Sequence, residues 1–198
     1  MRSNVKFKDR GIGNYFPNSY DAMVPELASE RLMASIPFAS RYRMCDFILS
    51  SMVHSGIDNI SIIVRKNYHS LLDHLGAAVS GIWSAKTEAE YCSSVRTETG
   101  KVFEGRIEAL ESLRGYLLKQ PQKYVIMTDA NIAINFDFNE LLDAHIKSGA
   151  DVTMMYRKQE IPKAFIRQSR DRMDLYYALG MNGDRVSKIY INPTEEGR

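Results

Sequence analysis

The chain has 198 residues, of which 44% are hydrophobic and 25% charged, as in an ordinary globular protein. At this length a single domain can bury a substantial core, and we expect one domain over residues 1–198. The formal net charge is only +2, and the lysines and arginines are scattered. This argues against a nucleic-acid-binding protein, which needs a clustered basic face.

Cysteine and histidine usage excludes further classes. Cys45 and Cys92 share no motif spacing, and Cys45 lies in an apolar helical pattern that predicts a small buried hydrophobic residue. With no secretory leader and no apolar run of about 18 residues, these thiols indicate a reducing, cytoplasmic setting and no membrane span. His69 and His74 are five residues apart, which does not suit a metal pair on a helix.

The first predicted elements lie between residues 43 and 76. Residues 43–55 carry an apolar stripe at helical spacing, and Gly56 follows as a stop signal. "NISIIV" at 59–64 is short and rich in β-branched residues, as in a strand buried on both faces of a parallel sheet. "NYHSLLDHLG" predicts a helix over 67–76 that ends at Gly76.

The middle of the chain predicts a loop, a helix and a strand. Residues 77–104 are irregular and rich in Ser, Thr and Glu, which favours a long loop of the kind that is often functional. A helix over 106–119 is expected to bury one face, and "YVIMTD" at 124–129 predicts a second buried strand. The face of that helix consists of Ile107, Leu110, Leu113 and Leu117.

The last predicted elements follow residue 138. A helix over 138–149 has Asn139 as its expected cap and Gly149 as its terminator. "DVTMMY" at 151–156 is a third strand candidate. Asn182-Gly183 lies between two strand-like runs and predicts a hairpin, because both residues tolerate positive φ.

Strands alternating with helices indicate βαβ units with right-handed crossovers. The expected fold class is therefore α/β, with a doubly wound, mostly parallel sheet and an added antiparallel hairpin.

Ligands of such sheets bind beyond the carboxyl ends of the strands. Three places qualify by position: 12–40, which follows the first strand, 65–70 and 128–138. Asp129 ends a buried strand, where its carboxylate could hold Mg²⁺ or a ligand hydroxyl, or could simply cap the following turn. Gly105 begins a helix whose first amides could receive an anion, or it is a plain helix start.

In order along the chain, five segments resemble the glucose-1-phosphate adenylyltransferases (ADP-glucose pyrophosphorylases). They are "RLMASIPFASRYRMCDFILSSMVHSGIDNISIIV", "YHSLLDHL", "FEGRIEALESLRGYL", "YVIMTDANIAINFDF" and "HIKSGADVTMMYRK". The resemblance covers most of residues 20–193. It is closest to the divergent second subunit that some bacteria encode beside the catalytic one for glycogen synthesis.

The resemblance implies a Rossmann-like nucleotidyltransferase domain followed by a left-handed β-helix, which is absent before the chain ends at "NPTEEGR". It also implies conversion of ATP and glucose 1-phosphate to ADP-glucose and pyrophosphate with Mg²⁺, in an oligomer with a catalytic adenylyltransferase subunit.

The phosphate-binding positions of the family are altered. Its loop G-G-x-G-T-R-L corresponds to "GIGNYFPNSYDAMVPEL", where Gly11 and Gly13 lie too far upstream to rebuild it. Its Arg-Ala-Lys-Pro-Ala becomes the run from Arg31 to Ser35, so the neutral Met33 replaces a lysine that stabilises the transferring phosphate.

Other positions of the family are kept in part. Its Gly-Thr-Ala-Asp-Ala becomes Gly105-Arg106-Ile107-Glu108-Ala109, and Asp129 matches the metal-binding and catalytic aspartate. The resemblance thus implies nucleotide binding by Gly105, Glu108, Ala109 and Arg31. The lysine of Glu-Lys-Pro is replaced by Asn192.

Nucleotidyl transfer depends on positioning and charge neutralisation, and losing one cation costs about 2–4 kcal/mol of transition-state stabilisation. We therefore expect a weakly active or inactive subunit that modulates a catalytic partner. Two alternatives remain: a working enzyme with Arg31, Arg41, Arg43 or Arg106 as substitute phosphate ligands, or a sugar-nucleotide sensor without chemistry.

Overall fold

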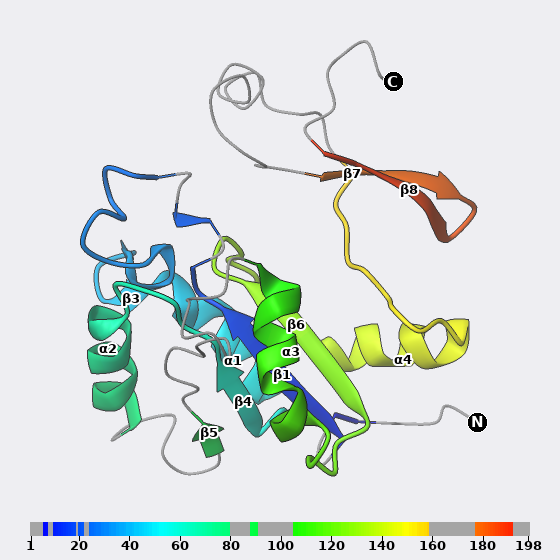
Figure 1. Cartoon of the computed structure of the whole chain (residues 1–198), viewed down its shortest axis with the longest axis horizontal. Helices are drawn as coiled ribbons and strands as arrows, with labels where there is room; N and C mark the ends of the chain where they lie inside the picture. Colours follow the sequence, from blue (N-terminus) through cyan, green and yellow to red (C-terminus); the bar gives the residue numbers. More distant parts are fainter. Residues whose placement is uncertain are drawn as a thin grey trace. The chain divides into compact units, whose positions relative to one another are not determined.

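Figure 1 shows the chain as a computed structural model. The structure describes residues 6–7, 10–18, 20–21, 24–79, 88–90, 105–158 and 177–191. The chain divides into two compact units, Met1–Met154 and Met155–Arg198. No helix within the described residues is both long and apolar enough to cross a lipid bilayer.

A parallel sheet forms the centre of the first unit. Its strands are β1 (Gly11–Phe16), β4 (Asn59–Ile62), β5 (Glu88–Glu90) and β6 (Tyr124–Asp129), in the order β5-β4-β1-β6. β1 pairs in parallel with both β4 and β6, and β4 pairs in parallel with β5. The predicted parallel sheet and its strand at 124–129 are confirmed. The strand is not buried on both faces as expected, because Val125 and Met127 are exposed.

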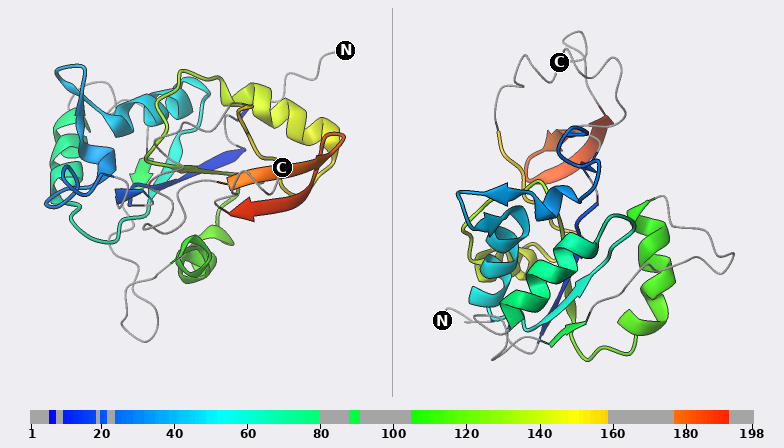
Figure 2. Two further views of the ribbon diagram at one scale, coloured as in Figure 1. Left: turned by 90° about the horizontal axis from the view of Figure 1, so that it is seen from above. Right: turned by 90° about the vertical axis from the view of Figure 1, so that its left-hand side faces the viewer.

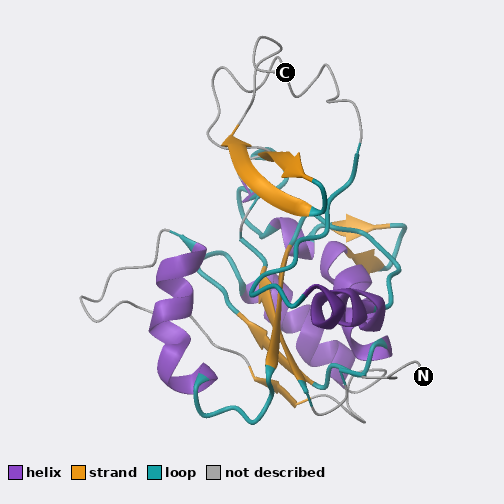
Figure 3. Cartoon of the chain, turned by 90° about the vertical axis from the view of Figure 1, so that its right-hand side faces the viewer, coloured by secondary structure: helices purple, strands orange, loops and turns teal. Residues whose placement is uncertain are grey.

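Helices cover both faces of this sheet. They are α1 (Met44–His54), α2 (His69–Val79), α3 (Arg106–Leu117) and α4 (Phe138–Ser148). α3 lies on one side of the sheet and the other three helices lie on the opposite side (Figures 2 and 3). This arrangement confirms the doubly wound α/β fold.

Each face has its own apolar cluster. On the α3 side, Ala109 and Leu113 pack against Phe16 and Ile63. The larger cluster joins α1, α2 and α4 to the sheet and also takes in Met33 of a short 3₁₀ helix, η2 (Met33–Ser35). Tyr15 of β1 belongs to the larger cluster and its neighbour Phe16 to the smaller one, as the alternation of side chains along a strand requires.

A small ribbon lies between η2 and α1. It consists of β2 (Pro37–Phe38) and β3 (Tyr42–Arg43), which pair antiparallel. The backbone N–H of Arg43 donates to Asp46 Oδ2 over 2.8 Å, which caps the first turn of α1. α1 ends before Gly56, whose φ of 81° confirms the predicted stop.

The second unit contains the predicted hairpin, β7 (Tyr177–Asn182) and β8 (Arg185–Ile191), paired antiparallel. Its two-residue loop is Gly183–Asp184, because Asn182 still pairs with Arg185. Gly183 has a φ of 60°, whereas Asn182 keeps a negative φ. The hairpin was predicted correctly, but its turn lies one residue later than expected.

Two predicted elements are corrected on the described residues. Residues 151–156 form no strand, and Val152, Met154, Met155 and Tyr156 are exposed. A strand needs a hydrogen-bonded neighbour, and an apolar run alone does not supply one. α2 does not end at Gly76 but continues to Val79, since Gly76 is followed by two alanines, the best helix formers.

The ends and faces of two other helices also differ from expectation. Asp137, not Asn139, caps α4, and its Oδ1 accepts the backbone N–H of Asn139 over 2.9 Å. Gly149 ends α4 with a φ of 59°, as predicted. On α3, Ile107 is 78% exposed, and Ala109 takes the buried place that was expected of Ile107. The helix itself spans Arg106–Leu117, two residues shorter than predicted.

The segment expected to be a long loop, 77–104, is described only in part. Its first residues complete α2, and Glu88–Glu90 form the edge strand β5 beside β4. The remaining residues of that loop prediction lie outside the described residues. The loop prediction is therefore wrong for the end of α2 and for the three residues of β5.

Candidate functional site

The strand order places the topological switch point between β1 and β6. From β1 the chain continues to β4 and β5 on one side, whereas β6 pairs with β1 on the other side. The last residues of the two strands, Phe16 and Asp129, are register partners. Since ligands of open α/β sheets bind beyond the carboxyl ends of strands at this point, the fold directs attention to Asp129 and to the loop after Phe16.

The loop after β1 is held by side chains rather than by glycines. Asn18, which is 7% exposed, accepts the backbone N–H of Arg65 on Oδ1 over 2.7 Å. Its Nδ2 donates to the carbonyl of Lys66 over 3.2 Å and to Asp21 Oδ2 over 3.0 Å. These bonds join the loop to the turn after β4. They also give the Arg65 backbone N–H, at the carboxyl end of the sheet, a partner within the chain.

Asp21 continues this network towards η2. Its Oδ1 accepts the backbone N–H of Met33 over 2.8 Å, so a second amide of the region is bonded internally. Burial raises the pKa of the Asp21 carboxyl, although the Met33 N–H and the Asn18 amide oppose that rise. A phosphate cradle needs free N–H groups that point at the ligand, and the amides of Met33 and Arg65 already have oxygen partners.

The glycines of β1 have a packing role. A Cβ at Gly11 would overlap the ring of Phe7, and one at Gly13 would lie 3.0 Å from the sulfur of Met52. Both residues lie within the strand, so they belong to the sheet and not to a loop after it. The first strand therefore extends to Phe16, later than the expected start of the loop at residue 12.

Met33 is a core residue. It is 8% exposed and belongs to the apolar cluster that contains Leu32, Ala34 and Cys45. Its thioether offers no hydrogen-bond donor to an anion.

Asp129 forms a two-pronged ion pair with Arg106, the first residue of α3. Arg106 Nε donates to Oδ1 over 3.0 Å, and Nη2 donates to Oδ2 over 2.7 Å. The side chains are 36% and 19% exposed, respectively. Gly105 is the N-cap residue of α3, and the Arg106 guanidinium lies 5.9 Å from the centre of the Tyr20 ring.

Residues 25–166 match the family model described as nucleotidyl transferase. The chain belongs to the nucleotidyl transferase family. It is 31% identical over 166 residues to the glycogen biosynthesis protein GlgD of Geobacillus stearothermophilus, covering 83% of this chain and 48% of that protein.

Two other relatives give a similar picture. GlgD of Bacillus subtilis is 26% identical over 180 residues, which cover 89% of this chain and 52% of the relative. Glucose-1-phosphate adenylyltransferase 2 of Vibrio vulnificus is 30% identical over 131 residues, with 65% and 32% covered. The chain spans about half the length of the GlgD relatives. The resemblance found in the sequence to the adenylyltransferases of glycogen synthesis is confirmed.

The structure brings only some of the expected site residues of this nucleotidyl transferase together. Gly105, Arg106 and Asp129 meet at the switch point. Both Ala109 and Glu108 belong to α3: Ala109 is fully buried on its inner face, and Glu108 is exposed in its first turn. Asn192 lies outside the described residues.

Arg31 is exposed. It lines a shallow hollow formed by the loop before η2 and the start of β2. Neither Asp129 nor any residue of α3 lines that hollow. This hollow does not join Arg31 to Asp129, and the nucleotide-binding role of Arg31 stays a prediction.

Nucleotidyl transferases generally use a divalent metal ion, and the expected ligand here is Asp129. The donor set fits one poorly, because both carboxylate oxygens already accept charged N–H groups of Arg106. A metal bound to either oxygen would stand beside a guanidinium of like charge. Sequence reasoning found Asp129 but missed this pairing, as well as the contacts of Asn18 and Asp21.

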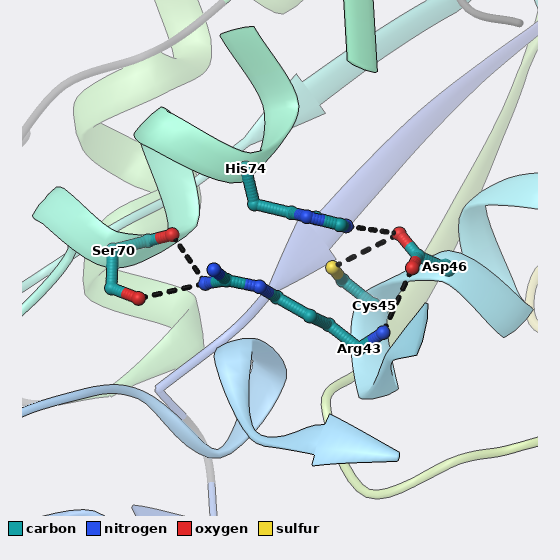
Figure 4. A network of polar contacts seen from close by, with 5 residues as sticks. All are labelled: Arg43, Cys45, Asp46, Ser70 and His74. Atoms are coloured by element: carbon teal, nitrogen blue, oxygen red, sulfur yellow. Dashed lines mark hydrogen bonds and ion pairs between the residues drawn. The ribbon is translucent and has the colours of Figure 1, made fainter. Parts of the chain in front are cut away.

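A second polar network joins α1 to α2 (Figure 4). Arg43 Nη1 donates to the carbonyl and to the hydroxyl oxygen of Ser70, over 2.6 and 2.7 Å. Asp46 Oδ1 lies 2.8 Å from His74 Nε2 and 3.7 Å from Cys45 Sγ. Arg43, one of the suggested substitute phosphate ligands, is thus occupied in connecting two helices.

Cys45, Asp46 and His74 could in principle hold a metal, since their ligand atoms lie within 4.8 Å of one another. The thiol of Cys45 is fully buried, and burial together with Asp46 raises its pKa above the ordinary range. Asp46 already accepts the backbone N–H of Arg43 and lies within hydrogen-bond distance of His74. This arrangement is better explained as an interhelical contact, and the predicted burial of Cys45 is confirmed.

Proposed function

We propose that the chain is a non-catalytic or weakly active domain of the ADP-glucose pyrophosphorylase system of glycogen synthesis. In this role it modulates or stabilises a catalytic adenylyltransferase that converts ATP and glucose 1-phosphate to ADP-glucose and pyrophosphate. The relatives named for glycogen biosynthesis and for glucose-1-phosphate adenylyltransferase support the pathway.

The observation that carries the proposal is the occupied switch point. Asp129 is paired with Arg106, and the backbone amides of Met33 and Arg65 bond to oxygens of the chain itself. A transferring phosphate needs free cations and free amides aimed at its oxygens. Met33 brings an apolar side chain where a lysine is expected to act.

The occupied arginines weigh against a working enzyme with substitute ligands. Arg106 is bonded to Asp129, and Arg43 is bonded to Ser70. Arg41 lies 5.5 Å from the ring of Tyr42 and is exposed, in the ribbon before α1. A triphosphate that used Arg106 or Arg43 would have to compete with these existing contacts.

The proposal is tested by measuring pyrophosphate release from ATP and glucose 1-phosphate. The chain is assayed alone and mixed with a bacterial glucose-1-phosphate adenylyltransferase, with bovine serum albumin as the protein control. We expect no turnover by the chain alone and a change in the kcat or KM of the partner in the mixture. Turnover by the chain alone that Asp129→Asn abolishes would refute a degenerate site.

A sensor without chemistry predicts a different result. ATP or ADP-glucose would then raise the Tm of the chain in the absence of any partner, because a ligand that binds the folded state stabilises it. The mixture would show no change in the kinetics of the adenylyltransferase. These outcomes separate a sugar-nucleotide sensor from a modulatory subunit.

A further inference from the structure

Arg106 and Asp129 differ from an ordinary surface ion pair in place and in geometry. The pair joins the carboxyl end of β6 to the first turn of α3, across 23 residues of sequence. Both carboxylate oxygens receive an N–H from the guanidinium, and the carboxylate is only 19% exposed. Such paired bonds fix the direction of the partners as well as their distance.

The environment favours this arrangement over a bound metal ion. The carboxylate lies at the N-terminal end of α3, where the partial positive charge of the helix adds to that of the guanidinium. The Tyr20 ring lies 5.9 Å from the guanidinium carbon and can attract it through its π face. A divalent ion at Asp129 would either displace Arg106 or stand beside its like charge.

We propose that Arg106 is a built-in cation that takes the place of a divalent metal at the switch point, so that Asp129 does not bind Mg²⁺ in this chain. The inference deepens the proposed function by assigning the state of the same site. It rests on the proposed function, which the same ion pair supports. The two experiments differ in what they measure, since the metal test needs neither turnover nor a partner, so their failures can be told apart.

The pairing is tested with Mn²⁺, a paramagnetic stand-in for Mg²⁺ that reports weak binding by broadening nearby amide signals. Substoichiometric Mn²⁺ is added to the ¹⁵N-labelled chain, and the signals of Thr128, Asp129 and Ala130 are followed. We expect no selective broadening of these signals in the wild-type chain. In Arg106→Thr their relaxation rates should rise about tenfold, because the competing charge-assisted bonds are gone.

Three further variants make the result specific. Arg106→Gln also removes the charge but keeps a long polar side chain, so it should show the same gain. Arg106→Thr combined with Asp129→Asn should lose the gain. Arg114→Thr, on an exposed part of the same helix, should behave as wild type.

Two results would overturn the inference. One is selective broadening around Asp129 in the wild-type chain that Asp129→Asn removes. The other is the absence of any gain in both Arg106 variants while their spectra show a native fold elsewhere. Neither result depends on turnover or on a partner, so neither bears on the assay of the proposed function.

Discussion

Replacing Met33 with lysine puts back the charge expected at this position of the family, and the structure predicts that it damages the fold instead. The Met33 side chain is 8% exposed in an apolar cluster. Asp21, the carboxylate that contacts the Met33 backbone, already accepts the N–H of Met33 and that of Asn18. A lysine ammonium at this position would be taken out of water among apolar side chains, and Asp21 could pair with it only beside its existing bonds.

The size of the effect follows from two contributions. Losing the buried thioether costs about 2 kcal/mol, and desolvating the ammonium adds several more before the chain relaxes. Because the long lysine side chain can turn its ammonium towards water and recover most of the second cost, we expect Met33→Lys to lower the free energy of unfolding by about 3 kcal/mol. With a urea m value of about 2 kcal/mol/M, this moves the midpoint down by about 1.5 M.

The assay is urea unfolding followed by far-UV circular dichroism, which reports the helices of the first unit. Met33→Leu is the matched control and should cost less than about 1.5 kcal/mol, because it conserves volume and polarity. Neither variant should bind ATP, since the amides of Met33 and Arg65 remain bonded internally. A lysine variant as stable as wild type would show that the position is open, and the reasoning would be refuted.

Three other predictions concern local features. Asp137→Ala should cost about 1 kcal/mol of unfolding free energy through loss of the α4 cap, with Asp137→Asn as the comparison. The Asn139 N–H lowers the pKa of Asp137, so the stability that its charge contributes is present above the ordinary pKa of 3.8 and is lost as pH falls through the folded-state value. Acid titrations of both variants would detect this loss. Gly115→Ala should raise the free energy of unfolding by about 0.5–1 kcal/mol, because Gly115 lies within α3 and a Cβ there meets nothing within 4 Å. Gly149→Ala should lower the free energy of unfolding by about 1 kcal/mol, because alanine is strained at the φ of 59°. Equal changes of the two variants in urea unfolding would contradict this. In a Cys92→Ser background, Cys45 should react with a thiol reagent at least about a hundredfold more slowly in the folded state than in urea, because it is buried and its pKa is raised; fast labelling of the native chain would show an open α1–α2 interface.

Local signals predicted the elements whose cause is local. Gly56 and Gly149 mark the ends of two helices because a positive φ is cheap for glycine, and both adopt one. The run at 124–129 became β6 because its neighbour β1 was available for pairing. The run at 151–156 is as apolar, but no described strand pairs with it, and composition alone cannot reveal a missing neighbour.

The state of the candidate site depends on contacts that are distant in sequence. Arg106 and Asp129 are brought together only after α3 packs on the sheet and β6 takes its register with β1. Asn18 reaches Arg65 across 47 residues for the same reason. The resemblance could identify Asp129 as a position of interest, but only the packed structure shows which side chain satisfies its charge.

The altered positions of the site depend on one another. A carboxylate that is only 19% exposed at the end of β6 is costly unless a cation satisfies it, and the chain supplies Arg106 in that role. Met33 packs into the core at the position where the family has a phosphate-binding lysine. Without that lysine, a phosphate that could bring a metal to Asp129 lacks one of its ligands. Under the proposed function, restoring one position alone leaves the others unsatisfied: Arg106→Thr frees a carboxylate without a phosphate ligand, and Met33→Lys adds a charge within an apolar cluster. We therefore expect strong nucleotide binding only when both positions are changed and the amides now bonded to Asn18 and Asp21 are released.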